Sequence, residues 1–285
     1  MPENPAPERA AGQATRESLF FREGARHRFT ARTATVTAVR EIAGRYVRVT
    51  LSGPELADFR SDGPADHVRV FFPDTAGRLY APKPAGPDVD GIRPADGPTF
   101  GRDFTPLAPR QNDTSAHREV DLDILRHEKP GPAAQWATNA KPGDRLGLVG
   151  PRGSKRAPQR VGRILLIVDG TALPSASRWL DDAAPHTSVE IIIDEVGGLD
   201  WAREYLALAG HPDVKLSAAG ADPTDAVRSA SVDSRTYVFA AGEASRVALV
   251  RRLLRNDLSL DPTQFTASGY WRSGEAAFDH HQPLD

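Results

Sequence analysis

A short segment at residues 102–105 combines a cation, an aromatic ring and a hydroxyl group, because it contains Arg102, Phe104 and Thr105. In an extended strand Arg102 and Phe104 share one face, while Thr105 points to the other. The guanidinium can then bind a phosphate while the ring packs against a flat heterocycle and the hydroxyl bonds to its edge. By itself the pattern is weak, because an Arg beside a strand aromatic is more often an exposed charge next to a core residue.

Two further segments have the chemistry of anion sites. Gly131 and Pro132 open a predicted helix, and the free N–H groups at a helix N-terminus attract anions. His127 lies just before this helix and can add a donor. The loop that contains Arg152 and Ser154 is rich in glycine, which allows a ligand to approach the backbone closely. An ordinary helix start and a tight turn with a solvated Arg explain these residues about equally well.

The composition limits the chemistry that is available. The 285 residues fit about two domains, and 39% hydrophobic residues, 26% charged residues and a net charge of −2 are ordinary for a globular chain. This charge gives no reason to expect a nucleic-acid partner. The absence of cysteine excludes disulfides, thiolate metal ligands, cysteine nucleophiles and iron–sulfur clusters. Redox chemistry would therefore require a bound cofactor.

Nothing in the sequence indicates export, membrane insertion or a metal site. The N-terminus lacks a basic start followed by an apolar run, and no segment approaches about 18 uninterrupted apolar residues. We therefore expect a cytoplasmic protein that does not insert into a membrane. His280 and His281 are adjacent, but they have no spaced partner motif, so we read them as a solvated tail and expect no metal.

Hydrophobic patterning divides the chain into three parts. Residues 1–27 lack sustained periodicity and predict a flexible arm with a possible short helix at 18–26. Residues 28–157 contain short alternating runs separated by turn residues, which indicates an antiparallel β-barrel. Residues 158–285 alternate strands and helices, which is typical of a doubly wound parallel sheet. The predicted strands are 163–168, 189–193, 214–216 and 236–240, and the predicted helices are 172–183, 200–209, 224–229 and 244–255.

Several motifs, taken in order, resemble the siderophore-interacting protein family, which are FAD-dependent ferric-siderophore reductases of the ferredoxin-reductase-like superfamily. The resemblance covers roughly residues 29–275, and the combination is far more specific than any single motif. It implies an FAD-binding barrel followed by an NAD(P)H-binding α/β domain. The matching segments are residues 66–72, 102–105, 131–136, 140–147, 149–154, 170–174, 241–243 and 268–272.

The resemblance implies roles for matched residues only. Arg102 would bind the FAD pyrophosphate, Phe104 would pack on the isoalloxazine in place of the more usual Tyr, and Thr105 would bond to the flavin edge. Phe104 and Thr105 are thus the implied catalytic residues. The implied cofactor-binding set is Arg102, Phe104, Thr105, His127, Gly131, Pro132, Ala133, Ala134, Trp136, Arg152, Ser154, Gly170, Thr171, Ala172, Gly242, Glu243, Tyr270 and Trp271.

The chain departs from the family pattern at two places. A second Arg commonly follows the Thr of the first motif, whereas here Pro106 intervenes and Arg110 is a displaced substitute. The family often has Gly-Asp-Glu before the Thr-Ala-Leu-Pro turn, whereas this chain has Gly170 after Asp169 and so lacks one carboxylate. These departures affect flavin phosphate affinity and nicotinamide binding.

The resemblance predicts that NAD(P)H provides electrons through FAD to Fe(III) in a siderophore, which then releases Fe(II). Because many such chelates are anionic, a cationic rim of Arg251, Arg255 and Arg272 would steer them, although the first two also fit a solvated helix face. We expect a monomer. Two alternatives stay open: a flavin-dependent biosynthetic or partner reductase on this scaffold, and a non-redox binding protein or repurposed catalyst that uses the interdomain cleft.

Overall fold

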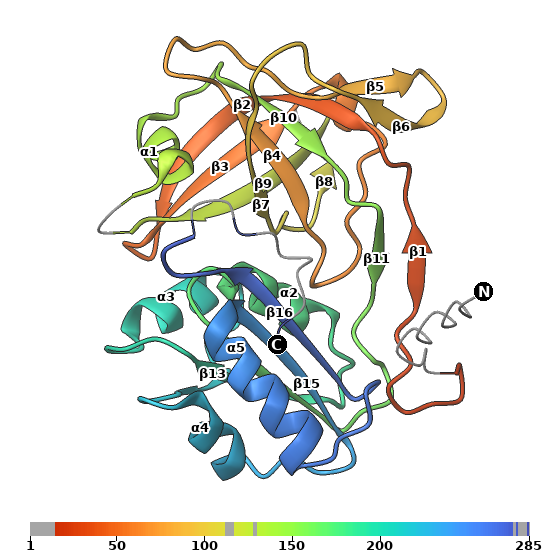
Figure 1. Cartoon of the computed structure of the whole chain (residues 1–285), viewed down its shortest axis with the longest axis vertical. Helices are drawn as coiled ribbons and strands as arrows, with labels where there is room; N and C mark the ends of the chain where they lie inside the picture. The colour runs from red at the N-terminus through yellow and green to blue at the C-terminus, as the bar shows by residue number, and fades with distance from the viewer. Residues whose placement is uncertain (1–14, 112–116, 128–129, 276–277, 279–283, 285) are drawn as a thin grey trace, which may run out of the picture.

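The computed structural model describes residues 15–111, 117–127, 130–275, 278 and 284. It contains a curled antiparallel sheet that sits above an α/β domain (Figure 1). The two are joined through β11 (Gly153–Lys155), after which the parallel sheet starts with β12 (Arg163–Val168). The change of architecture thus falls between residues 155 and 163.

The N-terminal domain is a seven-stranded sheet in the order β7-β4-β10-β2-β3-β9-β8, in which each pair is antiparallel. After β7, Pro106 forms an isolated bridge with Leu122 of β9, so the sheet curls back on itself. Alternating apolar side chains such as Val49, Val70 and Leu148 fill its interior. The elements are β2 (Ala31–Ile42), β3 (Tyr46–Ser52), η1 (Pro54–Leu56), β4 (Val68–Phe72), β7 (Phe100–Phe104), β8 (Arg110–Gln111), β9 (Arg118–Leu125), α1 (Pro132–Asn139) and β10 (Arg145–Val149), with a separate hairpin of β5 (Lys83–Gly86) and β6 (Val89–Arg93).

The C-terminal domain has a parallel sheet in the order β14-β13-β12-β15-β16. The apolar strand β12 is buried on both faces, as expected for the centre of a parallel sheet. Leu173 of α2 belongs to the core on one face and Val247 of α5 to the core on the other, so the domain is doubly wound. Its elements are α2 (Leu173–Asp182), β13 (Ser188–Ile193), α3 (Asp200–Leu208), β14 (Lys215–Ala218), α4 (Pro223–Ser229), β15 (Thr236–Glu243), α5 (Ala244–Arg252), η2 (Leu253–Asp257) and β16 (Phe265–Trp271).

The first part of the predicted arm, residues 1–14, lies outside the described residues. Residues 16–20 form turns and residues 24–26 form β1 (Gly24–Arg26), so the short helix suggested at 18–26 is wrong. Strand β1 pairs antiparallel with β11, and Phe20 packs on the core of the α/β domain. The Arg22 guanidinium lies 4.9 Å from the Trp179 ring centre and donates to the Tyr237 hydroxyl at 3.2 Å. Local periodicity could not reveal these long-range contacts.

The two domains make direct hydrogen bonds across their interface. The Tyr46 hydroxyl donates to the Gly170 carbonyl oxygen at 2.8 Å, and Arg178 donates to Ser61 Oγ at 2.8 Å. Arg178 is buried and also donates to the Pro106 carbonyl oxygen at 3.0 Å. A buried guanidinium that is satisfied only across the interface favours one relative placement of the domains. This contact therefore fixes how the residues of the two domains face each other across the interface.

No helix within the described part of the chain is long and apolar enough to cross a membrane. Within that part, no cluster of three or more His, Asp or Glu side chains is arranged to hold a metal ion. His280 and His281, the pair that the sequence singled out, lie outside the described residues.

Candidate active-site cavity

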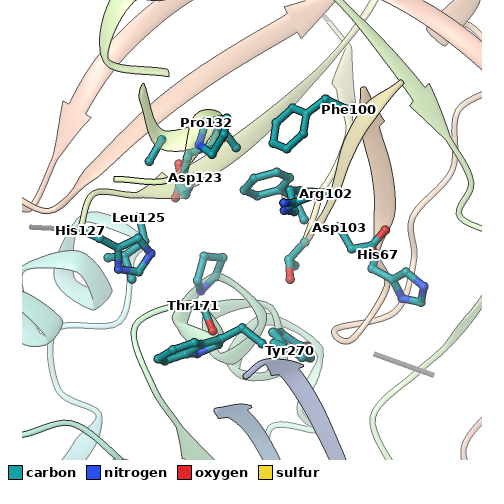
Figure 2. A pocket seen from close by; sticks show the side chains of 18 residues that line it. His67, Phe100, Arg102, Asp103, Asp123, Leu125, His127, Pro132, Thr171 and Tyr270 are labelled. Carbon is teal, nitrogen blue, oxygen red and sulfur yellow. The ribbon is translucent and has the colours of Figure 1, made fainter. Parts of the chain in front are cut away.

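A cavity of about 340 Å³ lies at the junction of the barrel and the α/β domain (Figure 2). Strands β7 and β9, the start of α1 and the residue before β4 form one wall, while the turn after β12, the start of α2 and the end of β16 form the other. Its lining residues are His67, Phe100, Arg102, Asp103, Phe104, Thr105, Asp123, Ile124, Leu125, His127, Gly131, Pro132, Ala133, Ala134, Thr171, Pro174, Tyr270 and Trp271.

Strand β7 brings a cation and aromatic rings to the cavity, as the alternation at residues 102–105 predicts. The Arg102 guanidinium lies 4.5 Å from the ring centre of Phe100, which the sequence analysis did not single out. The Phe104 ring packs edge-on against Phe72, with ring centres 6.0 Å apart, so its orientation is fixed by the barrel core. Burial and nearby Arg69 lower the pKa of Arg102, but a guanidinium stays charged in proteins.

Helix α1 presents its N-terminus to the same cavity. Its N-cap is Gly131, which has no side chain that could accept hydrogen bonds from the first-turn N–H groups. Such groups stay available to an anion. A Cβ atom at Gly131 would meet nothing within 4 Å, so this entrance is open. His127 lies at the cavity edge, where burial and the nearby Arg45 lower its pKa.

Thr105 lies just beyond β7 and is buried at the cavity. Burial raises the pKa of Tyr270 on β16 to about 12, so its phenol stays protonated at neutral pH, although the nearby Ser175 and Thr105 side chains oppose the rise. Ser175 on α2 donates to the Pro64 carbonyl oxygen at 2.8 Å.

The buried carboxylate of Asp169 organises the opposite wall. One oxygen accepts from Thr171 N at 2.8 Å and from the Thr171 hydroxyl at 2.5 Å. The other accepts from Glu243 N at 2.9 Å and from the Trp271 indole N–H at 2.8 Å. Burial raises the pKa of Asp169, while these hydrogen bonds oppose the rise. Asp169 thus joins the turns after β12 and β15 to the end of β16, and the sequence analysis did not assign it this role.

The glycines beside Asp169 are needed for different reasons. Gly242 has φ +148, and a Cβ atom there would lie 2.6 Å from Asp169 Oδ2. A larger residue would therefore displace the carboxylate. A Cβ atom at Gly170 would lie 3.0 Å from Leu125 Cδ2 and 3.4 Å from Glu195 Oε1. Gly170, where this chain lacks a carboxylate of the family pattern, thus lies in a narrow space. The acidic side chain of Glu195 borders that space.

The predicted cofactor residues fall into three groups. Arg102, Phe104, Thr105, His127, Gly131, Pro132, Ala133, Ala134, Thr171, Tyr270 and Trp271 line the cavity. Behind the wall lie Gly170, Ala172, Gly242 and Glu243, of which Glu243 caps α5 by accepting from Arg246 N at 3.0 Å. Trp136, Arg152 and Ser154 lie away from it.

The residues away from the cavity have other partners. Trp136 packs against Phe72 at 5.2 Å, and Arg152 lies 3.8 Å from the Phe29 ring centre. Ser154 is buried and donates to Asp66 Oδ2 at 2.5 Å. These contacts explain the three predicted residues by packing or by structural hydrogen bonds, without a ligand.

The predicted substrate cations also lie outside the cavity wall. Arg251 is at the far end of α5 and donates to the Leu284 carbonyl oxygen, while Arg255 follows in η2. Arg272 lies 5.1 Å from the Phe278 ring centre. Arg110, the displaced substitute for a second phosphate-binding Arg, donates to Asp121 Oδ2 at 2.7 Å. The structure thus does not bring these cations together at one place.

Several lining residues have no signal in the sequence. Asp123 is one of them: its carboxylate accepts from Arg48 Nε and Nη2 and from the Tyr205 hydroxyl, each at 2.7 Å. This acid belongs to a strand in which acidic and apolar residues alternate, so the local pattern does not distinguish it from Glu119 and Asp121. His67, Phe100, Asp103, Ile124, Leu125 and Pro174 are the other lining residues that the sequence analysis missed.

The barrel wall fits FAD chemically. A guanidinium and an uncapped helix N-terminus suit a pyrophosphate, and the Phe100 and Phe104 rings suit a flat heterocycle. The opposite wall lies at the carboxyl edge of a parallel sheet where the strand order reverses, between β12 and β15. Open α/β sheets bind nucleotides at this place.

Family models match both halves of the chain. Residues 35–155 match the siderophore-interacting FAD-binding domain, and residues 161–274 match the siderophore-interacting protein. A ferredoxin reductase of carbazole 1,9a-dioxygenase has the same fold, with a TM-score of 0.54 at 18% identity over 84% of this chain and 67% of that one. The ferredoxin-reductase-like architecture expected from the sequence is therefore confirmed.

Individual relatives support the same assignment. The NADPH-dependent ferric-chelate reductase of Escherichia coli (strain K12) is 28% identical over 92% of this chain and 96% of its own. Ferric vibriobactin reductase ViuB of Vibrio cholerae is 26% identical over 85% and 89% of the two chains. A siderophore utilization protein from T. fusca is 30% identical over 92% of this chain and all of its own, with a TM-score of 0.70. The chain belongs to the siderophore-interacting protein family.

Proposed function

We propose that this protein is an FAD-dependent oxidoreductase that reduces Fe(III) in a siderophore complex with electrons from NAD(P)H. The observation that carries the proposal is the interdomain cavity, in which a phosphate-binding barrel wall faces the nucleotide-binding edge of a parallel sheet. Relatives named as ferric-chelate and ferric vibriobactin reductases, which match most of the chain, support the choice of substrate.

In this proposal, the residues of the barrel wall bind and orient FAD. Arg102 and the N–H groups at the start of α1 hold its phosphates, and Phe104 contacts the flavin ring. FAD held there would supply the redox chemistry, which is hydride acceptance from NAD(P)H and one-electron transfer to Fe(III). The contact with Phe72 holds the Phe104 ring in place before the cofactor binds.

The α/β wall would orient the nicotinamide nucleotide. Thr171 and Trp271 line the cavity on this side, and Asp169 fixes both through hydrogen bonds. A wall that is already organised can hold the reacting ring close to the flavin without a further ordering cost. The net reaction consumes one NAD(P)H and two Fe(III) and yields NAD(P)⁺, two Fe(II) and one proton.

The ferric siderophore must approach the bound flavin closely enough for electron transfer. Arg251, Arg255 and Arg272 stay candidates for steering an anionic chelate, but none of them lines the cavity. Their proposed role is therefore long-range attraction, which weakens with ionic strength. We also propose that the protein acts as a cytoplasmic monomer without a nucleic-acid partner.

An anaerobic assay with the full-length chain tests this function. The purified protein is expected to bind FAD, to bleach on addition of NADH or NADPH, and to reoxidise when a ferric siderophore is added. A chromogenic Fe(II) chelator should then record two Fe(II) for each NAD(P)H consumed.

Two outcomes would favour the alternatives. Flavin reduction without Fe(II) release would indicate a flavin reductase with another acceptor. A colourless protein that fails to take up added FAD would indicate a non-redox role.

A further inference from the structure

The loop of residues 194–200, which follows β13, lies beside the nucleotide-binding edge of the α/β domain. Strand β13 neighbours β12 in the sheet, and Asp194 N donates to the Val168 carbonyl oxygen at 2.8 Å. The Glu195 carboxylate comes within 3.4 Å of a Cβ atom built at Gly170. This loop therefore flanks the turn where nucleotide phosphates would bind, at the position where doubly wound folds contact the adenosine ribose.

The loop is acidic, and two of its carboxylates are paired with the guanidiniums of Arg246 and Arg45. Asp194 accepts from Arg246 Nε with both carboxylate oxygens, at 2.9 and 2.8 Å, and the same guanidinium donates to the Ala221 carbonyl oxygen. Glu195 accepts from Arg45 Nη1 at 2.7 Å and Nη2 at 3.3 Å. Residues 194–200 include three carboxylates, the third being Asp200, and no Lys or Arg.

The same loop offers an apolar contact for a base. The Val196 side chain is 97% exposed, although large apolar side chains are usually covered in a folded domain. It is followed by Gly197 and Gly198, where added Cβ atoms would meet nothing within 4 Å. The carboxylates of this loop can accept hydrogen bonds from ribose hydroxyls, and the exposed Val196 side chain can contact a base. This combination suits an adenosine group.

We infer that residues 194–200 bind the adenosine ribose of NADH and disfavour the 2′-phosphate of NADPH. This inference rests on the proposed function and adds the choice of nucleotide. A ribose 2′-hydroxyl can donate to a carboxylate, whereas a 2′-phosphate brings like charge beside Asp194, Glu195 and Asp200. The Arg246 and Arg45 guanidiniums already bind the carboxylates of Asp194 and Glu195, so part of their charge is neutralised before any phosphate arrives.

Equilibrium binding measures the preference between the two nucleotides and does not depend on turnover. The FAD-loaded, full-length protein is titrated calorimetrically with NAD⁺ and with NADP⁺. We expect NAD⁺ to bind at least about ten-fold more tightly. Glu195→Gln and Asp194→Asn each remove one carboxylate charge and should narrow this ratio to about three-fold or less. Glu204→Gln makes the same charge change at an exposed position on α3 and should leave the ratio unchanged.

The inference is overturned if the wild-type protein binds NADP⁺ as tightly as NAD⁺, or if both loop variants keep the wild-type ratio. Glu195→Gln alone decides the second point if Asp194→Asn fails to fold, because Glu195 makes its ion pair at a partly exposed position. Failure of the proposed function is a different result, since it requires that neither NADH nor NADPH reduces the bound flavin.

Discussion

The two walls of the cavity differ in how far their polar groups are already satisfied within the protein. On the barrel wall, the first turn of α1 has no side-chain cap, and the Phe100 and Phe104 rings face the cavity. On the α/β wall, Asp169 accepts hydrogen bonds from Thr171 and Trp271 and binds them into one unit. The start of α1 on the barrel wall thus has N–H donors for a ligand, whereas Thr171 and Trp271 on the other wall already donate to Asp169.

This difference fits two kinds of ligand. A resident cofactor gains affinity from charge-assisted contacts with groups that have spare hydrogen-bonding capacity. A nucleotide that must leave after each turnover needs a correctly placed surface more than a large binding energy. We therefore expect substitutions in the barrel wall to affect FAD affinity and substitutions around Asp169 to affect flavin reduction.

The largest effect is expected for Arg102→Ala. Loss of a charge-assisted phosphate contact should weaken FAD binding about 100-fold, so that the protein is purified largely colourless. Visible absorbance and fluorescence titration with FAD measure the change. Arg145→Ala removes an exposed Arg at the start of β10 outside this cavity and serves as the control. Yellow Arg102→Ala protein with wild-type affinity would show that this wall does not hold FAD.

Asp169→Asn should show most clearly that one wall controls flavin reduction and the other controls FAD binding. The asparagine NH₂ group would face the Glu243 N–H or the Trp271 indole N–H, which leaves at least one buried donor unsatisfied. We expect the free energy of unfolding to fall by about 2 kcal/mol. Anaerobic stopped-flow should show slower flavin reduction, with the Kd for FAD within about two-fold of wild type, since these contacts lie on the other wall. Loss of FAD affinity together with reduction would mean that the two walls act as one site.

Trp271→Phe should also affect the nicotinamide nucleotide without affecting FAD binding, but by a smaller amount. The variant keeps an aromatic ring at the cavity but loses the hydrogen bond to Asp169, which is worth about 1 kcal/mol. We expect the KM for the nicotinamide nucleotide to change about three-fold and FAD binding to stay constant. Trp136→Phe alters a tryptophan that packs on Phe72 away from the cavity and should change neither value.

The sequence predicted the elements of both domains better than the hydrogen bonds between them. The apolar run of β12 and the helix start at Gly131 are local signals, and the structure has both elements. The role of Asp169 depends on partners from three different turns and strand ends, so no local pattern contains it. Ser154 is a similar case, because its hydroxyl donates to Asp66, a residue 88 positions away that no local pattern connects with it.

Strand β16 was missed for a related reason. Its residues 265–271 mix polar and apolar side chains and are mostly half-buried, because β16 lies at the edge of the sheet. An edge strand with α5 beside it lacks the continuous apolar run that revealed β12. The position of Tyr270 and Trp271 on the cavity wall follows from this strand and could not be derived before it was placed.

The smallest predicted effect uses pH to test His127 on the barrel wall. Burial and Arg45 lower the pKa of His127 from its usual 6.5, so without FAD its stabilising contribution is present above pH 6.5 and lost as pH falls through the lowered pKa. A bound phosphate would favour the protonated ring and raise that pKa. FAD affinity should therefore rise about three-fold as pH falls from 8 to 6, while the FAD-free protein loses stability.

His127→Gln should remove both trends, because glutamine does not titrate. Fluorescence titration with FAD and thermal unfolding of the FAD-free protein, each across this pH range, measure them separately. If FAD affinity in the wild-type protein falls with pH in step with stability, then no phosphate lies near His127, and Arg102 and the α1 N-terminus hold the pyrophosphate without it.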